Sequence, residues 1–453
     1  MLTGNPTPMG LDFADLDRAG AAAEQLEERL RTRTARVAVI GLGYVGLPLA
    51  VEFARAGFAV LGIEVSEEKV AQLGEGRSYV QEVDGEAVAE LLRTGQFVPT
   101  LDFGLLSGAD VVIVCVPTPL RKSKEPNISY VVAAAEQIRG HLHRGQLVVL
   151  ESTTYPGTTD ELLLSKLQET GLSLDRDFFL AFSPERIDPG NPRYRTHNIP
   201  KVIGGVSSES TRLARLAYEQ VVEKVFEVSS ARVAETAKLL ENTFRNINIA
   251  LVNELAQLCR RLGVDVWEVI DAAGTKPFGF MPFYPGPGIG RHCIPLDPHY
   301  LSWKARTLGF EARFIGLAEE INSAMPSYVV NLAADALNDR SKCLRGARVL
   351  VLGVAYKEDI DDVRESPAIS IIESLLAKGS EVSFHDPYVA ELQLAGSTLR
   401  SVPLEDSLES SDCVLIITAH SVFDMREIAS RAQLVVDTRN ATRGVAVGNV
   451  VKL

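Results

Sequence analysis

One short segment of the chain combines residues that can do chemistry with residues that shape a loop. It is PGPGIGRHCIPLDPHY, residues 285–300, which places Cys293 among four prolines and three glycines. Because neither a helix nor a central strand tolerates so many breakers, we expect a shaped loop here. A cysteine is usually a small buried hydrophobic residue, but the amides of a glycine-rich loop can approach a substrate, and an adjacent imidazole can lower a thiol pKa. We therefore predict that Cys293 is a nucleophile.

The same segment also contains potential metal ligands. His292, Asp297 and His299 lie within six residues of Cys293. Their spacing fits no zinc pattern, and a catalytic zinc needs ligands that rigid elements hold in place. An inert core thiol and a metal site are thus the alternatives to a nucleophile, and we expect no metal.

A second group of residues is typical of dinucleotide binding. Gly41, Gly43 and Gly46 form GxGxxG directly after an expected strand and at the start of an expected helix. The first glycine allows the tight turn, the second lets the backbone meet a pyrophosphate, and the third lets the helix pack on the strand. Glu64 ends the next strand, where an acid binds the adenosine ribose hydroxyls and repels a 2′-phosphate. The pattern predicts NAD rather than NADP, and the alternative is a structural turn in a Rossmann-like fold.

Polar residues also occur on an expected long helix and after expected strands. Lys238 and Asn242 lie four apart, on one helix face, where they could stabilise an oxyanion or position a water; the alternative is a solvated face. Glu185 in SPERIDPGN and the hydroxyls of ESTTYPGTT (151–159) follow strand ends, where the active sites of α/β proteins gather. Glu185 is a candidate acid or base, and ordinary turn chemistry is the alternative.

A further loop, YKEDIDDVRESPA (356–368), contains cations among acids. Lys357 and Arg364 bracket three aspartates and a glutamate after an expected strand. Such cations suit a diphosphate, and a surface ion-pair loop is the alternative.

The elements that position these residues follow from the hydrophobic pattern. RVAVIGLGYVGLPLAVEFARAGFAVLGIE predicts strand, turn, helix and strand, and more buried strands follow, separated by helical stretches. Residues 230 to about 262 predict one long helix, and helices continue to about 340. From Arg348, RVLVLGVAY repeats RVAVIGLGY, but Ala355 and Glu358 replace the second and third glycines. We therefore expect an α/β chain, with two Rossmann-like doubly wound domains joined by a central long-helix domain. The expected boundaries are an N-terminal extension at 1–35, an NAD-binding domain at 36–215, the central domain at 216–340 and a C-terminal α/β domain at 341–453.

The composition excludes several classes of protein. The chain has 453 residues, of which 46% are hydrophobic, and its net charge is −13, which disfavours nucleic acid as a partner. No apolar run is long enough to span a membrane, and the N-terminus lacks the pattern of a secretory signal. The five scattered cysteines include no CxxC. We expect a globular cytoplasmic protein with reduced thiols that binds neither nucleic acid nor a membrane.

Several motifs together make the chain similar to a known family. It resembles the UDP-glucose/GDP-mannose dehydrogenases, which are NAD-dependent nucleotide-sugar 6-dehydrogenases. The shared motifs occur in the order of that family, from about residue 36 onward: GLGYVGLPLA, VPTP, SPERIDPGN, AKLLENTFRNINIALVNELA, PGPGIGRHCIPLDP and GVAYKEDIDDVRESPA. Three further segments, ESTTYPGTT, NIPKVIGG and KPFGFMPFYPGPG, look most like enzymes that act on UDP-N-acetylglucosamine. The alternative sugars are those of UDP-glucose, UDP-N-acetylgalactosamine and UDP-N-acetylmannosamine.

The resemblance implies a reaction and a set of roles. The C6 hydroxyl of the UDP-sugar is oxidised by two NAD molecules in turn, and Cys293 holds a thiohemiacetal and then a thioester. The other catalytic residues would be Lys238, Asn242, Asp297, Glu185 and Thr118. The cofactor would contact Gly41, Gly43, Tyr44, Val45, Gly46, Glu64, Lys69, Pro117, Thr118, Thr153 and Arg364. The UDP-sugar would contact Glu185, Arg186, Lys238, Asn242, Gly290, Lys357 and Arg439.

The resemblance also implies an assembly. The long helix would pair two subunits into at least a dimer, so that the central domain is a dimerisation domain, and residues near Lys276 would reach the neighbour's substrate. The C-terminal domain would bind the UDP-sugar.

Two residues depart from the family pattern. Arg291 stands where the family has a glycine before the histidine and nucleophile, and Pro189 stands where the glucose enzymes have a second glutamate. Two other functions are alternatives. A two-electron dehydrogenase with long dimer helices would need neither the loop cysteine nor the second α/β domain. An inactive NAD-binding scaffold would not need Cys293, Lys238 and Asn242 together.

Overall fold

The computed structural model describes residues 13–453 except 81, 122, 188–190, 192, 291–292 and 446. The chain divides into two compact units, Met1–Leu240 and Glu241–Leu453, which we describe separately. The four domain boundaries predicted from the sequence stay predictions. Arg291 and Pro189, the two departures from the family pattern, lie outside the described residues.

The first unit is built on one eight-stranded sheet in the order β3-β2-β1-β4-β5-β6-β7-β8. Neighbouring strands are parallel except β6 and β7, which pair antiparallel. The order from β3 to β6 is that of a dinucleotide-binding fold, as predicted. The strands are β1 (Arg36–Ile40), β2 (Ala59–Ile63), β3 (Phe97–Thr100), β4 (Val111–Val114), β5 (Gln146–Leu150), β6 (Phe178–Phe182), β7 (Lys201–Gly205) and β8 (Val225–Glu227).

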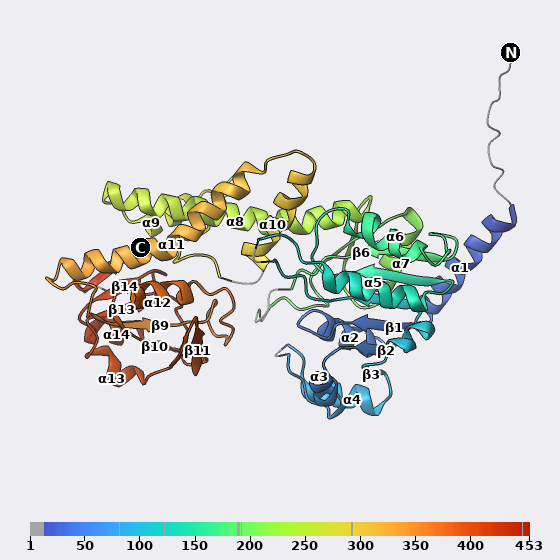
Figure 1. The fold of residues 1–453 in the computed structure, drawn as a ribbon, viewed down its shortest axis with the longest axis horizontal. Helices are drawn as coiled ribbons and strands as arrows, with labels where there is room; N and C mark the ends of the chain where they lie inside the picture. Colours follow the sequence, from blue (N-terminus) through green and yellow to red (C-terminus); the bar gives the residue numbers. More distant parts are fainter. Residues whose placement is uncertain are drawn as a thin grey trace, which may run out of the picture. The chain divides into compact units, whose positions relative to one another are not determined.

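Helices cover both faces of this sheet, because alternate residues of its strands are buried in two different cores. Val37 and Val39 of β1 pack with α1, α2, α4 and α7, whereas Ala38 and Ile40 pack with α5 and α6 (Figure 1). The helical segments are α1 (Phe13–Arg31), α2 (Gly46–Arg55), α3 (Glu67–Gly74), α4 (Gly85–Arg93), η1 (Phe103–Gly108), α5 (Ser129–His141), η2 (Thr158–Leu163), α6 (Leu164–Gln168) and α7 (Ser208–Tyr218).

The N-terminal helix α1 lies within the predicted N-terminal extension, and one of its sides is buried. Leu26 and Leu30 are buried in the core that contains β1. Arg29 Nη1 also donates to Asp110 Oδ1 at 2.5 Å. The apolar side of α1 therefore packs on the first unit.

The predicted long helix is α8 (Ala231–Leu262), and the boundary between the two units falls within it. Three more helices follow, α9 (Val266–Gly274), α10 (Cys293–Thr307) and α11 (Arg313–Asn338). The expectation of a loop over all of 285–300 is wrong from Cys293 onward, where α10 begins in spite of two prolines. Pro295 lies in the first turn of α10, where backbone N–H groups have no helical partner, so its lack of an N–H removes no helical hydrogen bond. Pro298 lies deeper in the helix, and a side chain of α8 compensates for the N–H that it lacks.

The second unit contains a parallel five-stranded sheet in the order β10-β9-β13-β14-β15. Its first strand, β9 (Arg348–Leu352), is the predicted repeat of β1. In Figure 1, α11 and α12 lie on one face of this sheet and α13 and α14 on the other. The remaining elements are α12 (Pro367–Ala377), β10 (Glu381–His385), β11 (Glu391–Leu394), β12 (Ser397–Arg400), α13 (Leu404–Leu408), β13 (Cys413–Ile416), α14 (Met425–Arg431), β14 (Val435–Asp437) and β15 (Val450–Lys452). Over the described ranges, no helix has the length and apolar character needed to cross a membrane.

Candidate active site

The glycine turn between β1 and α2 has room for a ligand at one of its three glycines. Gly41 has φ +90°, and a Cβ there would lie 2.5 Å from the carbonyl oxygen of Cys115. A Cβ on Gly46 would lie 1.8 Å from the carbonyl oxygen of Gly41, whereas a Cβ on Gly43 would meet no atom within 4 Å. The fold itself thus requires the first and third glycines, and the second leaves open the space over the N-terminus of α2. A pyrophosphate needs that space.

Glu64 follows β2 and its carboxylate lies against the glycine turn. Its Oε2 accepts from Leu42 N at 3.1 Å, and its Oε1 accepts from Val65 N at 2.8 Å. Lys69 Nζ lies 3.6 Å from Oε2. Tyr79, which the sequence analysis missed, donates from its hydroxyl to the carbonyl of Leu42 at 2.8 Å. Glu64 and Tyr79 therefore hold the turn at which a dinucleotide would bind.

The other predicted cofactor residues lie at the same edge of the sheet. Pro117 and Thr118 follow β4, which pairs parallel with β1, and Thr153 follows β5, which pairs parallel with β4. Ser152 joins the two loops by donating from its hydroxyl to the carbonyl of Val116 at 2.8 Å. Tyr44 and Val45 lie in the glycine turn itself, and Tyr44 is exposed. The residues present therefore fit a dinucleotide such as NAD.

Glu185 follows β6, and its carboxylate is held on both oxygens. Its Oε1 accepts from Arg186 N at 2.6 Å and from Ile187 N at 2.5 Å. Its Oε2 lies 3.4 Å from Lys201 Nζ. Arg186 in turn donates from Nη1 to the carbonyl of Pro200 at 2.7 Å. Two backbone N–H donors and a cation therefore hold the Glu185 side chain in place.

Lys201 belongs to a buried charge cluster that the sequence analysis missed. Its Nζ lies 2.6 Å from Glu151 Oε2, and the hydroxyl of Tyr218 donates to Glu151 Oε1 at 2.5 Å. Burial lowers the pKa of Lys201, but the charges of Glu151 and Glu185 outweigh it and hold the pKa above its ordinary value. The available signal was a charged residue inside an otherwise apolar strand, as in PKVIGG.

Glu235, on the first turns of α8, was also missed. It accepts hydrogen bonds from Gly157 N at 2.6 Å, from Thr159 N at 2.9 Å and from Thr159 Oγ1 at 2.7 Å. Burial raises the pKa of its carboxyl to about 7, although these hydrogen bonds oppose the shift. Glu235 therefore ties the segment after β5, where the predicted Thr153 lies, to the helix of Lys238.

In the second unit, Asn242 and Asp297 are hydrogen-bonded to each other. Asn242 Nδ2 donates to Asp297 Oδ2 at 2.5 Å, and both side chains are buried. Asp297 lies four residues after Cys293, so both are on one face of α10. Cys293 is the exposed first residue of that helix. Lys238 is also buried, which decides the open question about its helix: this face of α8 is not solvated.

The glycine-rich segment before Cys293 packs against one predicted substrate residue and against the chain neighbour of another. A Cβ on Gly286 would lie 2.6 Å from Arg439 Nη1, and a Cβ on Gly290 would lie 2.7 Å from Cβ of Tyr356, the neighbour of Lys357. Arg439 Nε donates to the carbonyl of Ile417 at 2.8 Å. Burial lowers the pKa of Arg439 to about 10, which the acids nearby only partly oppose. The structure thus gathers Arg439, Gly290 and the Lys357 turn around one loop.

Arg364 is exposed and forms a two-pronged contact with Asp362, from Nε to Oδ1 at 2.9 Å and from Nη2 to Oδ2 at 2.6 Å. This is the ion pair that the sequence analysis left open as the alternative. The predicted residues therefore fall into two sets. Lys238, Glu185, Arg186, Thr118 and the glycine turn belong to the first unit; Cys293, Asn242, Asp297, Gly290, Lys357, Arg364 and Arg439 belong to the second.

Comparison with known proteins identifies the family. Models of the UDP-glucose/GDP-mannose dehydrogenase family match residues 35–222 as the NAD binding domain, 232–324 as the central domain and 350–444 as the UDP binding domain. A UDP-N-acetyl-D-glucosamine 6-dehydrogenase of Pseudomonas aeruginosa is 39% identical over 393 residues, which are 86% of this chain and 91% of that protein. A UDP-N-acetyl-D-mannosamine dehydrogenase of Pyrococcus horikoshii is 35% identical over 423 residues, 92% of this chain and 98% of that protein.

A solved structure agrees with these matches. The structure of a UDP-D-ManNAc dehydrogenase from Pyrococcus horikoshii superimposes with a TM-score of 0.84 at 34% identity, covering 92% of this chain and 98% of that one. The three domain matches together cover most of the chain. The glycine turn with room for a pyrophosphate lies in the domain matched as NAD-binding. The chain therefore belongs to the UDP-glucose/GDP-mannose dehydrogenase family and is an NAD-dependent nucleotide-sugar dehydrogenase.

Proposed function

We propose that this dehydrogenase oxidises the C6 hydroxyl of UDP-N-acetylglucosamine to the carboxylate through a covalent intermediate on Cys293. The observation that carries the proposal is the buried Asn242–Asp297 hydrogen bond one helical turn from Cys293. NAD supplies the hydride acceptor for both oxidations. In balance, one alcohol, one water and two NAD give one carboxylate, two NADH and three protons.

Cys293 stores the substrate between the two oxidations. Its sulfur bonds to C6 of the aldehyde that the first hydride loss leaves, and the aldehyde oxygen becomes the hydroxyl of a thiohemiacetal. Loss of the second hydride from C6 and of the hydroxyl proton gives a thioester, and water then cleaves the C–S bond and returns the thiol.

The buried polar residues of α8 support this chemistry. Lys238 and Asn242 lie four residues apart on the same face, so an oxygen at C6 can be held between an ammonium and an amide N–H. Asp297 is positioned by Asn242 to take up the proton that the C6 hydroxyl or the thiol releases. Glu185, which is positioned by Arg186 N, Ile187 N and Lys201, suits a group that accepts a proton from the attacking water.

The choice of sugar rests on the relatives. Relatives named for UDP-N-acetyl-D-glucosamine reach 39% identity, and those named for UDP-N-acetyl-D-mannosamine reach 35%. Both substrates are UDP-linked and N-acetylated, and they differ in configuration at C2. UDP-N-acetyl-D-mannosamine is therefore the second candidate.

We also propose that two copies of the chain pair through α8. Phe244, Leu251 and Leu258 are exposed large hydrophobic residues spaced by seven, and Leu262 continues the stripe. A heptad spacing of apolar residues is the pattern by which helices pair. A second copy of this helix would bury the stripe. Sedimentation of the chain and of a Leu251→Asp variant tests this: the variant is expected to be monomeric, and an unchanged dimer would overturn this interface.

The reaction is tested by an endpoint count of NADH formed per UDP-N-acetylglucosamine, with sugar limiting and NAD in excess. We expect a ratio near two, and a Cys293→Ser variant is expected to lose full turnover while NAD binding is kept. A ratio near one would mean release of the aldehyde and would contradict the four-electron reaction. Turnover of UDP-N-acetyl-D-mannosamine in preference would move the proposal to the second candidate.

A further inference from the structure

The helix that begins at Cys293 contains a proline that breaks its hydrogen-bond pattern. In an α-helix the N–H of residue 298 donates to the carbonyl of residue 294, but Pro298 has no N–H. Asn246 of α8 supplies the missing donor: its Nδ2 donates to the carbonyl of Ile294 at 3.2 Å. Asn246 is buried. A side chain of α8 thus completes the first turns of α10, next to Cys293.

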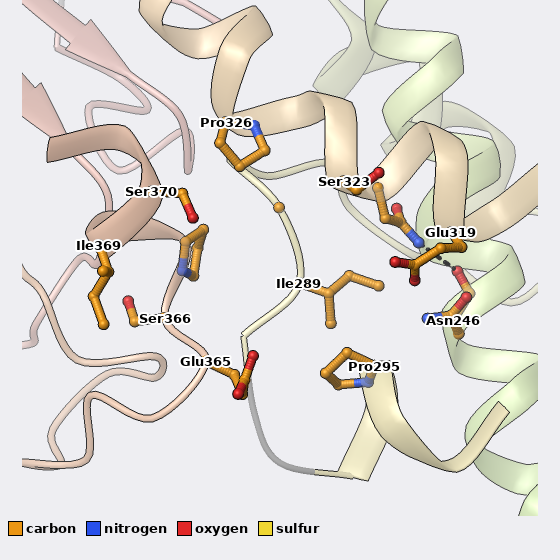
Figure 2. A pocket seen from close by; sticks show the side chains of 13 residues that line it. Asn246, Ile289, Pro295, Glu319, Ser323, Pro326, Glu365, Ser366, Ile369 and Ser370 are labelled. Carbon is orange, nitrogen blue, oxygen red and sulfur yellow. Dashed lines mark hydrogen bonds between the residues drawn. The ribbon is translucent and has the colours of Figure 1, made fainter. Parts of the chain in front are cut away.

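Asn246 is the end of a chain of buried amides. The backbone carbonyl of Asn246 accepts a hydrogen bond from Asn322 Nδ2 at 3.2 Å, which is drawn as the dashed line beside Asn246 in Figure 2. Asn322 Oδ1 accepts from Asn253 Nδ2 at 2.9 Å, and Asn253 Oδ1 accepts from Gly286 N at 2.9 Å. This series of hydrogen bonds therefore connects Ile294 to Gly286, and Cys293 lies between these two residues in the sequence.

The direction of every hydrogen bond in this chain is determined by its ends. Gly286 N can only donate, so Asn253 must present its oxygen there and its NH2 to Asn322. Asn322 must then present its NH2 to the carbonyl of Asn246, and the carbonyl of Ile294 can only accept from Asn246. All three asparagines are buried. A network of hydrogen bonds with one orientation holds its members in one arrangement.

The same face of α8 also holds α10 at a second point. Asn242, one turn before Asn246, donates to Asp297, and Asp297 is one residue before Pro298. The first turn of α10 is therefore fixed through the carbonyl of Ile294 and through the carboxylate of Asp297. A shift of that turn would move Cys293 relative to Asn242, and errors of about 1 Å in such a distance cost about 100-fold in rate.

We propose that Asn246 is a positioning residue for Cys293. It replaces the hydrogen bond that Pro298 removes, and through Asn322 and Asn253 it ties the other side of the glycine-rich segment to the same helix. The proposal rests on the proposed role of Cys293 as the nucleophile. Because Pro298 has no N–H to donate to the carbonyl of Ile294, the position of the Cys293 thiol depends on a hydrogen bond from α8 instead of one within α10.

A double-mutant cycle tests the proposal, because Pro298→Ala supplies an N–H to Ile294 from within α10. In the Pro298 background, Asn246→Ala is expected to lower kcat between about 10- and 100-fold. In the Pro298→Ala background, the same substitution is expected to change kcat less than about 3-fold, since the carbonyl then has a donor. NAD affinity, measured by calorimetry, is expected to stay within about 2-fold throughout, because the glycine turn belongs to the first unit. The control is Asn248→Ala, whose amide donates within α8 to the carbonyl of Phe244 at 2.7 Å and is expected to act equally in both backgrounds.

A second readout separates this proposal from the proposed function. The rate at which iodoacetamide alkylates Cys293, followed by mass spectrometry without substrate, is expected to change on Asn246→Ala and to return toward its parent value in the Pro298→Ala background. Equal effects of Asn246→Ala in both backgrounds would overturn the positioning role. If Asn246→Ala does not fold, kcat and the alkylation rate are measured for Asn246→Ser in the same two backgrounds. Full turnover by Cys293→Ser would instead overturn the proposed function, and the alkylation cycle would still stand.

Discussion

Asn242 Nδ2 lies 2.5 Å from Asp297 Oδ2, so that an amide on α8 is oriented by a buried carboxylate on α10. Both side chains are buried. We expect Asp297→Asn, which keeps an acceptor oxygen but loses the charge, to keep the fold and to lower kcat by about 100- to 10,000-fold. Asp297→Ala should also lower the free energy of unfolding by about 1–3 kcal/mol, because the amide of Asn242 loses its acceptor.

Steady-state NADH formation and urea unfolding check this prediction. The exposed Asp335 on α11 offers a matched control, since Asp335→Asn should change neither quantity. Wild-type turnover by Asp297→Asn would show that the charge of Asp297 takes no part in the reaction.

Lys201 should matter for stability through the two carboxylates that it neutralises. Lys201→Met leaves Glu151 buried without a cation, and breaking a buried pair in this way costs about 3–5 kcal/mol. Glu185 also loses its cation, so thioester hydrolysis should slow and a covalent adduct on Cys293 should become detectable by mass spectrometry.

Urea unfolding of Lys201→Met is compared with that of Lys224→Met, which removes an exposed lysine just before β8. A further substitution, Glu151→Gln, should recover part of the stability lost in Lys201→Met. Equal unfolding free energies for Lys201→Met and Lys224→Met would mean that the cluster contributes nothing.

Local pattern made much of the fold predictable. The apolar period of residues 230–262 predicted α8, which spans Ala231–Leu262, and the repeat at Arg348 predicted β9. Both signals lie within one element. Gly41 and Gly46 were predictable because the GxGxxG pattern lies within one short segment. A Cβ on Gly46 would meet the carbonyl of Gly41, and a Cβ on Gly41 would meet the carbonyl of Cys115 at the end of the adjacent strand.

Contacts between distant segments were not predictable in this way. Lys201 meets Glu151 only because β7 lies two strands from β5, and β7 runs antiparallel to β6, which no residue pattern indicated. The helix at Cys293 was missed because Pro298 argues against it locally, and its compensation comes from Asn246 on another helix. Prolines count against a helix only when nothing else supplies the lost donor.

Glu235 predicts how stability depends on pH. Burial raises the pKa of its carboxyl from 4.5 to about 7 in the folded chain. The folded state then binds the proton more tightly than the unfolded state, so this group's contribution is present below pH 4.5 and is lost as pH rises through about 7. The free energy of unfolding should fall over this interval by up to about 3 kcal/mol on account of Glu235.

Urea unfolding at several pH values checks the sign. Glu235→Gln cannot ionise, so the fall between pH 5 and 7 should be smaller than in the wild type, whereas Glu24→Gln on the exposed side of α1 should leave the pH profile unchanged. If the free energy of unfolding changed with pH by the same amount in Glu235→Gln as in the wild type and in Glu24→Gln, the raised pKa of Glu235 would be contradicted.

The two glycines of the turn should separate cofactor binding from folding. A Cβ on Gly43 meets no protein atom within 4 Å, and Gly43 does not need a positive φ, so Gly43→Ala should keep the melting temperature and weaken NAD binding by at least about 10-fold. A Cβ on Gly46 would lie 1.8 Å from the carbonyl oxygen of Gly41, so Gly46→Ala should destabilise the first unit even without NAD. Calorimetric NAD titration and thermal unfolding of both variants check this. The methyl group added by Gly43→Ala would meet no protein atom and would fill only the space over α2. Unchanged NAD affinity in this variant would therefore mean that NAD does not occupy that space.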